Sequence, residues 1–133
     1  MSESEVLISQ VEKALNQQKK RLEQMLTCLE QELDAIKQRD ANLMVEISEQ
    51  KELQLEAIKN ADAALNNESY VNAIQTSSKL QQLKQEITTL LEDCQTKNEV
   101  CYLTATQNQL TIEKVKNLLV GGSKNTTYNE QGQ

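Results

Sequence analysis

The three cysteines are the most reactive side chains of this chain, and their number and spacing limit what they can do. Cys28, Cys94 and Cys101 occur in a 133-residue sequence that has no histidine. A zinc site would therefore have three thiolates and no histidine as a fourth ligand. Cys94 and Cys101 are seven residues apart, a helical spacing that favours small buried side chains. An odd number of cysteines without a CxxC pair predicts reduced thiols in the cytoplasm.

Other kinds of chemistry are poorly represented. The 20 acidic residues are distributed over helix faces that should be solvated, where no pocket would shift their pKa values. No glycine precedes residue 121, so there is no phosphate-binding loop. Lys19-Lys20-Arg21 is the one basic cluster, and a net charge of −6 with 2% aromatic residues argues against nucleic-acid binding. We expect no catalytic residue, no cofactor, no metal, no secretory signal and no membrane span.

The composition predicts an all-α fold. The chain has no proline, all three glycines follow residue 120, and helix-forming Gln, Glu, Lys and Leu dominate. Apolar periodicity predicts helices at about 4–37, 41–65 and 78–120, joined by a connector at 66–77 that could hold one helical turn. Asp40 and Ser78 are the expected N-caps, although one continuous helix through residue 40 stays open. We expect an elongated antiparallel three-helix bundle over residues 1–120 and a flexible tail over 121–133.

The first predicted helix carries a heptad repeat, formed by Ile8, Leu15, Leu22, Leu29 and Ile36. This repeat is typical of a coiled-coil seam. Gln18 and Glu32 interrupt the companion positions, so the seam is imperfect.

The last predicted helix changes character along its length, which would be roughly 65 Å. Its first half has one apolar face and looks like scaffold. From residue 100 onward a second apolar face adds Val100, Leu103, Leu110 and Leu118. Another helix of this chain, a second copy or a partner protein could cover that face. Asn98 and Asn108 lie on or near the core stripe, which leaves open a kink or a polar layer.

Two stretches then resemble the FlgN family of flagellar type III export chaperones. The first is the Glu- and Leu-rich run from Leu29, through the Arg39-Asp40 break, to Leu55. The second begins at Asn98 and continues through a leucine-rich helix to a tail with Tyr128 and Gly132. Cys101-Tyr102 stands where the family usually has Asn-Gly.

The resemblance implies a function without catalysis. Such chaperones bind the hook–filament junction (hook-associated) proteins in the cytoplasm, keep them soluble and unassembled, and deliver them to the export gate. It implies client contacts in the last helix and a gate contact in the tail, at Tyr128. The client candidates are Val100, Leu103, Leu110, Ile112, Val115 and Leu118. The alternative is a structural coiled-coil protein that self-associates through the second apolar face, and a homo-oligomer stays open. Tyr128 could also be a chance aromatic.

Overall fold

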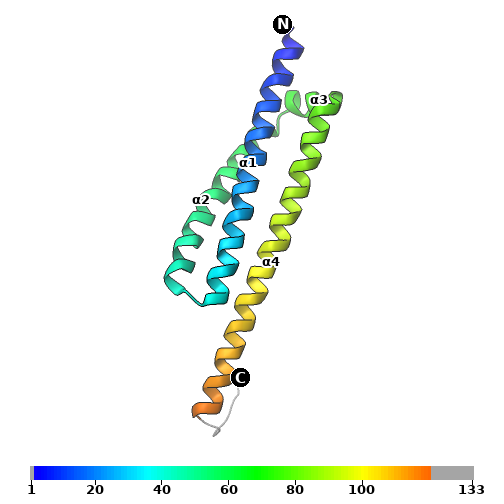
Figure 1. The fold of residues 1–133 in the computed structure, drawn as a ribbon. Helices are drawn as coiled ribbons and strands as arrows, with labels where there is room; N and C mark the ends of the chain where they lie inside the picture. The colour runs from blue at the N-terminus through cyan, green and yellow to red at the C-terminus, as the bar shows by residue number, and fades with distance from the viewer. Residues whose placement is uncertain (1, 121–133) are drawn as a thin grey trace.

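Four helices form the regular structure of the described part of the chain (Figure 1). The computed structural model describes the backbone of residues 2–120 and the side chains of residues 2–108. The helices are α1 (Glu3–Gln38), α2 (Ala41–Leu65), α3 (Glu68–Thr76) and α4 (Ser78–Val120). The all-α prediction is confirmed. The proposed tail, 121–133, lies outside the described residues.

The chain breaks between α1 and α2 where the sequence suggested. Arg39 adopts the left-handed conformation, with φ of 57°. Its N–H donates to the carbonyl of Ile36, and the N–H of Asp40 donates to the carbonyl of Ala35, a pattern that terminates a helix. The carboxylate of Asp40 then accepts from the N–H of Leu43 at 3.1 Å and caps α2. The two helices are therefore separate.

The connector is more ordered than expected. It contains the nine-residue helix α3, which Asn67 caps by accepting from the N–H of Tyr70. The prediction that Ser78 caps the last helix is wrong by one residue. Ser77 is extended, with φ of −119° and ψ of 120°, and its hydroxyl accepts from the N–H of Leu80. Ser78 is already helical, so its side chain cannot take that position.

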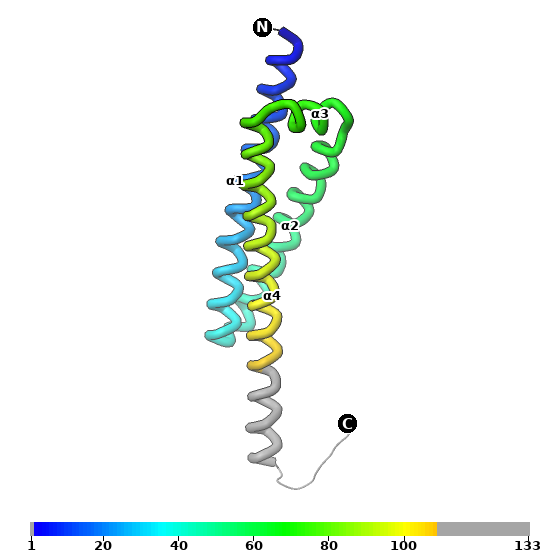
Figure 2. The backbone as a smooth tube through the Cα atoms, turned by 90° about the vertical axis from the view of Figure 1, so that its right-hand side faces the viewer, coloured from blue at the N-terminus to red at the C-terminus, as the bar shows by residue number. Residues whose placement is uncertain are grey.

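The helix α1 is the centre of the fold. It packs closely against both α2 and α4, whereas α2 and α4 approach each other much less closely. The helices α1 and α4 run in the same direction, and α2 runs in the opposite one (Figures 1 and 2). The short α3 crosses one end and contacts α1 and α4.

The core follows α1 as three small clusters. Two of them join α1 to α4, around buried Leu15 with Leu80, and around buried Leu29 with Cys94. The third joins α1 to α2 through Ile47, near the turn between these helices. Full burial of a leucine side chain contributes roughly 1.5–3 kcal/mol to stability, so these thin layers account for the association of the helices. Ile47 is the one buried residue of α2.

Candidate functional site

The register between α1 and α4 determines which face of α4 packs against α1. The thiol of Cys94 donates to the carbonyl of Leu22 at 3.5 Å, and that of Cys101 donates to the carbonyl of Leu29 at 3.4 Å. One heptad further on, the side-chain amide of Asn108 donates to the carbonyl of Ile36 at 2.8 Å. Each pair is 72 residues apart. This constant offset shows two parallel helices in heptad register.

The same register shows where α1 stops covering α4. Because Ile36 lies opposite Asn108, the end of α1 at Gln38 falls close to residue 110 of α4. The helix α4 continues to Val120 and extends past the turn between α1 and α2 (Figure 1). At a rise of 1.5 Å per residue this extension is roughly 15 Å long. A helix face in that extension has no α1 beside it.

Three apolar side chains of α4 are exposed close to this extension. Val100 is 40% exposed and Leu103 is 61% exposed, as the second apolar face predicted. Tyr102 is 62% exposed, and our interpretation of the sequence did not select it. At 100° per residue the three lie about 100° or more away from Cys101, which faces α1 and is 3% exposed. We call the side of α4 that is turned away from α1, with Leu103 near its centre and Val100 and Tyr102 at its two edges, the open face of α4. The scarcity of aromatic residues in the chain could have drawn attention to Tyr102.

The other candidate contacts cannot be placed. Leu110, Ile112, Val115 and Leu118 belong to α4, but their side chains lie outside the described residues. Tyr128 also lies outside them. Of the six candidate client contacts, the structure therefore places the side chains of Val100 and Leu103, and both are exposed.

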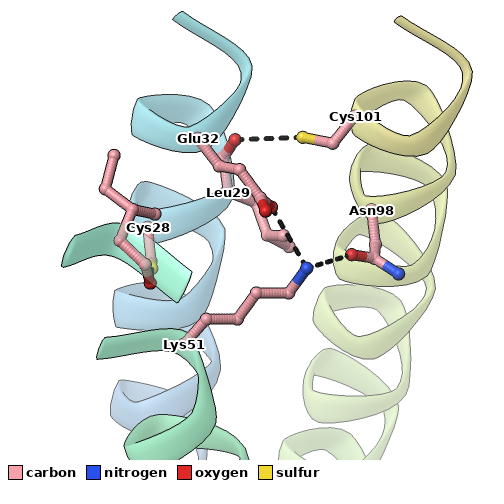
Figure 3. A network of polar contacts seen from close by, with 7 residues as sticks. Cys28, Leu29, Glu32, Lys51, Asn98 and Cys101 are labelled. Carbon is pink, nitrogen blue, oxygen red and sulfur yellow. Dashed lines mark hydrogen bonds and ion pairs between the residues drawn. The ribbon is translucent and has the colours of Figure 1, made fainter. Parts of the chain in front are cut away.

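A polar cluster fastens the three long helices just before the open face begins (Figure 3). The ammonium of Lys51 on α2 donates to the carboxylate of Glu32 on α1 at 3.1 Å and to the amide oxygen of Asn98 on α4. The two side chains of the ion pair are 21% and 17% exposed. Gln18, the other polar interruption of the α1 seam, is buried and donates to the carbonyl of Ile58 on α2. The two interruptions in the seam therefore hold α2 in place.

The asparagines near the core stripe do not break α4, which is a single helix from Ser78 to Val120. Asn98 meets Lys51, and Asn108 bonds α1, so both provide polar contacts between helices.

The cysteines are placed for packing. All three are free and buried. Burial raises the pKa of Cys28 and Cys94, and burial with the nearby carboxylate of Glu32 raises the pKa of Cys101 to about 11. A thiol with a raised pKa stays protonated at neutral pH, and the thiolate is the form that reacts or binds metal. Within residues 2–108 no group of His, Cys, Asp or Glu side chains has the arrangement of a metal site.

The open face is an apolar surface that a protein partner could cover, and it lies on a long helix that contacts α1 and α3. Among the described residues, no helix has the length and apolarity needed to cross a membrane.

The family model described as FlgN protein matches residues 1–133. No curated protein and no solved structure gives a match. Since the match covers the whole sequence, the chain belongs to the FlgN family, a family of flagellar export chaperones.

Proposed function

We propose that this protein binds hook–filament junction proteins in the cytoplasm, keeps them soluble and unassembled, and delivers them to the type III export gate. The observation that carries the proposal is the open face of α4, where Val100, Tyr102 and Leu103 are exposed on a helix that extends past its neighbours. Family membership supplies the kind of function, and the open face supplies a place for it.

The open face has the properties that an amphipathic client helix would need. The helix α1 already covers the opposite side of α4, through the heptad contacts of Cys94, Cys101 and Asn108. A client helix that lies along the open face would meet apolar side chains without displacing α1. Burial of an exposed Leu or Tyr side chain against a partner contributes roughly 1.5–3 kcal/mol, so a few such residues suffice for specific binding.

The mechanism needs no chemical step. A client segment that assembles through its own apolar stripe cannot do so while that stripe is covered by α4. Release then requires competition for the client at the export gate. We assign the client contacts to Val100, Leu103, Leu110, Ile112, Val115 and Leu118, to which we add the exposed Tyr102, and the gate contact to Tyr128.

A double substitution of Val100→Asp with Leu103→Asp tests the client site. Two buried carboxylates in the interface should weaken the binding of the C-terminal region of a hook-associated protein at least a hundredfold, measured by isothermal titration calorimetry. Both side chains are exposed in the free protein, so the circular dichroism and the thermal midpoint should change little. Leu55→Asp with Leu91→Asp is the matched control, because these side chains are 45% and 44% exposed and gain the same two charges away from the open face.

Two results would overturn the assignment. Unfolding of the double variant would show that Val100 and Leu103 belong to the core. Unchanged client binding by a folded double variant would show that the client binds elsewhere. The alternative function, self-association through the same face, predicts instead that the wild type sediments as an oligomer and that the double variant becomes a monomer.

A further inference from the structure

The outer face of α2 is a second surface that the fold leaves uncovered. It contains Val45 and Leu53, which are 61% and 75% exposed, and Leu53 is the most exposed large apolar residue of the described chain. Glu49, Glu52 and Glu56 lie between and beside them and are also exposed. At 100° per residue these five positions lie on the side of α2 opposite the buried Ile47. We define these five residues as the outer face of α2.

The carboxylates of the outer face form no ion pair with the described residues. None of them takes part in an ion pair within the described part of the chain. Lys51, one of the two basic residues of α2, points inward to Glu32 and Asn98. The other, Lys59, lies at the far end of the face without an ion-pair partner among the described residues.

Their spacing also works against the isolated helix. Glu46, which flanks the face, Glu49 and Glu52 follow at intervals of three, and Glu56 follows at four. Like charges at these intervals are neighbours on a helix surface and destabilise it. A partner that brings positive charge would relieve this repulsion at the same time as it covers Val45 and Leu53. The apolar and the electrostatic features therefore select the same kind of partner.

We propose that the outer face of α2 docks a basic amphipathic helix of another protein, with Val45 and Leu53 against its apolar stripe and Glu49, Glu52 and Glu56 against its Lys or Arg side chains. A second copy of this chain is a poor occupant, because two acidic faces would repel each other and the chain carries a net charge of −6. This surface lies on α2 and is separate from the open face of α4, so the proposal does not depend on the proposed function.

The test uses the full chain and a designed peptide of about 18 residues, five helical turns, with leucines on one face and lysines beside them. Its binding is followed by fluorescence anisotropy. Replacement of Glu49→Gln with Glu56→Gln should weaken binding about fivefold to tenfold, as expected for two exposed ion pairs. Leu53→Ser should weaken it about tenfold through the lost apolar contact. Higher salt should also weaken it, because exposed charges are screened.

The control variant is Glu92→Gln with Glu99→Gln, which removes the same two charges, also seven residues apart, from exposed positions of α4. It should change the affinity less than twofold. A peptide of the same composition, with the leucines spread around the helix, should bind at least about tenfold more weakly, because it has no apolar stripe to cover Leu53.

Several outcomes would overturn the proposal. Absence of saturable binding to the wild type would do so directly. Equal weakening by both glutamine pairs, or equal binding of the rearranged peptide, would show attraction to net charge alone. A wild-type dimer that Leu53→Ser converts to a monomer in sedimentation would show that a second copy occupies the face.

Discussion

Two of the three ion pairs that join α1 to its neighbours among the described residues offer a direct test of how burial determines stability. The pair Lys51–Glu32 has an N–O distance of 3.1 Å and side chains that are 21% and 17% exposed. The pair Lys19–Glu86 is shorter, at 2.8 Å, but its side chains are 32% and 38% exposed. Distance alone ranks the second pair as stronger. We predict the opposite order of coupling energies.

The magnitudes follow from Coulomb's law. With an effective dielectric constant of about 20, the attraction at 3.1 Å is about 5 kcal/mol, and relaxation of the unpaired partners in the single variants reduces the measurable coupling to about 2 kcal/mol. At the more exposed Lys19–Glu86 pair the dielectric constant is near that of water, about fourfold higher, which weakens the attraction in proportion. Side-chain ordering offsets much of the remaining attraction, so we expect a small coupling between Lys19 and Glu86.

Two double-mutant cycles measure these couplings. One combines Lys51→Met with Glu32→Gln, and the other combines Lys19→Met with Glu86→Gln. The free energy of unfolding in urea is measured for all variants at low and high salt. A cycle cancels the desolvation cost of each separate group and leaves the coupling between them. Salt at about 1 M should remove most of the Lys19–Glu86 coupling and little of the Lys51–Glu32 coupling.

The reasoning is refuted if the coupling of Lys19 with Glu86 equals or exceeds that of Lys51 with Glu32. It is also refuted if salt reduces the two couplings by the same fraction. Either result would mean that the position of Lys51 between three helices does not shield it from water.

Three further predictions concern the helix break, the thiols and the tail. Arg39→Gly should raise the free energy of unfolding by about 0.5–1 kcal/mol, because glycine adopts φ of 57° without the steric cost of a side chain; a lower urea midpoint would contradict this. Raising the pH from 9 to 11 should destabilise the protein by about 2 kcal/mol through Cys101, whose pKa is raised to about 11 by burial. The sign follows because the unfolded thiol loses its proton above pH 9 while the folded thiol keeps it. Cys101→Ala should lose that part of the alkaline slope, and an unchanged slope would argue against it. Tyr128→Ala should keep client binding and impair export, and normal export would remove Tyr128 as the gate contact.

Much of the fold could be predicted from local patterns. The end of α1 and the N-cap at Asp40 follow from the chemistry of Arg39-Asp40-Ala41, because a cap depends only on residues close in sequence. The short helix α3 was harder to predict, since nine residues give too short a periodic signal and its stability comes from packing Ala73 against the α1 and α4 cluster. The same short periodic signal left the end of α3 undefined, which explains why the N-cap of α4 was predicted at Ser78 and lies at Ser77.

The candidate site was predictable in part. The helical wheel identified Val100 and Leu103 as lying away from the core, and both are exposed. The same wheel could not find Tyr102 or the outer face of α2. Periodicity shows that a residue lies on one side of a helix, but the exposure of Tyr102 or Leu53 depends on whether a neighbouring helix reaches it.

The sequence by itself determined that the chain is helical, where its long helices break, and which heptad positions seek burial. Those properties depend on backbone propensities and on the helical period, which each segment carries within it. Only the tertiary structure decided which helices pair. It set α1 parallel to α4 with an offset of 72 residues, placed Gln18 and Lys51 as the ties to α2, and left one end of α4 without α1 beside it. These outcomes depend on contacts between distant segments, so the last helix became two regions, one packed along α1 and one that extends beyond it.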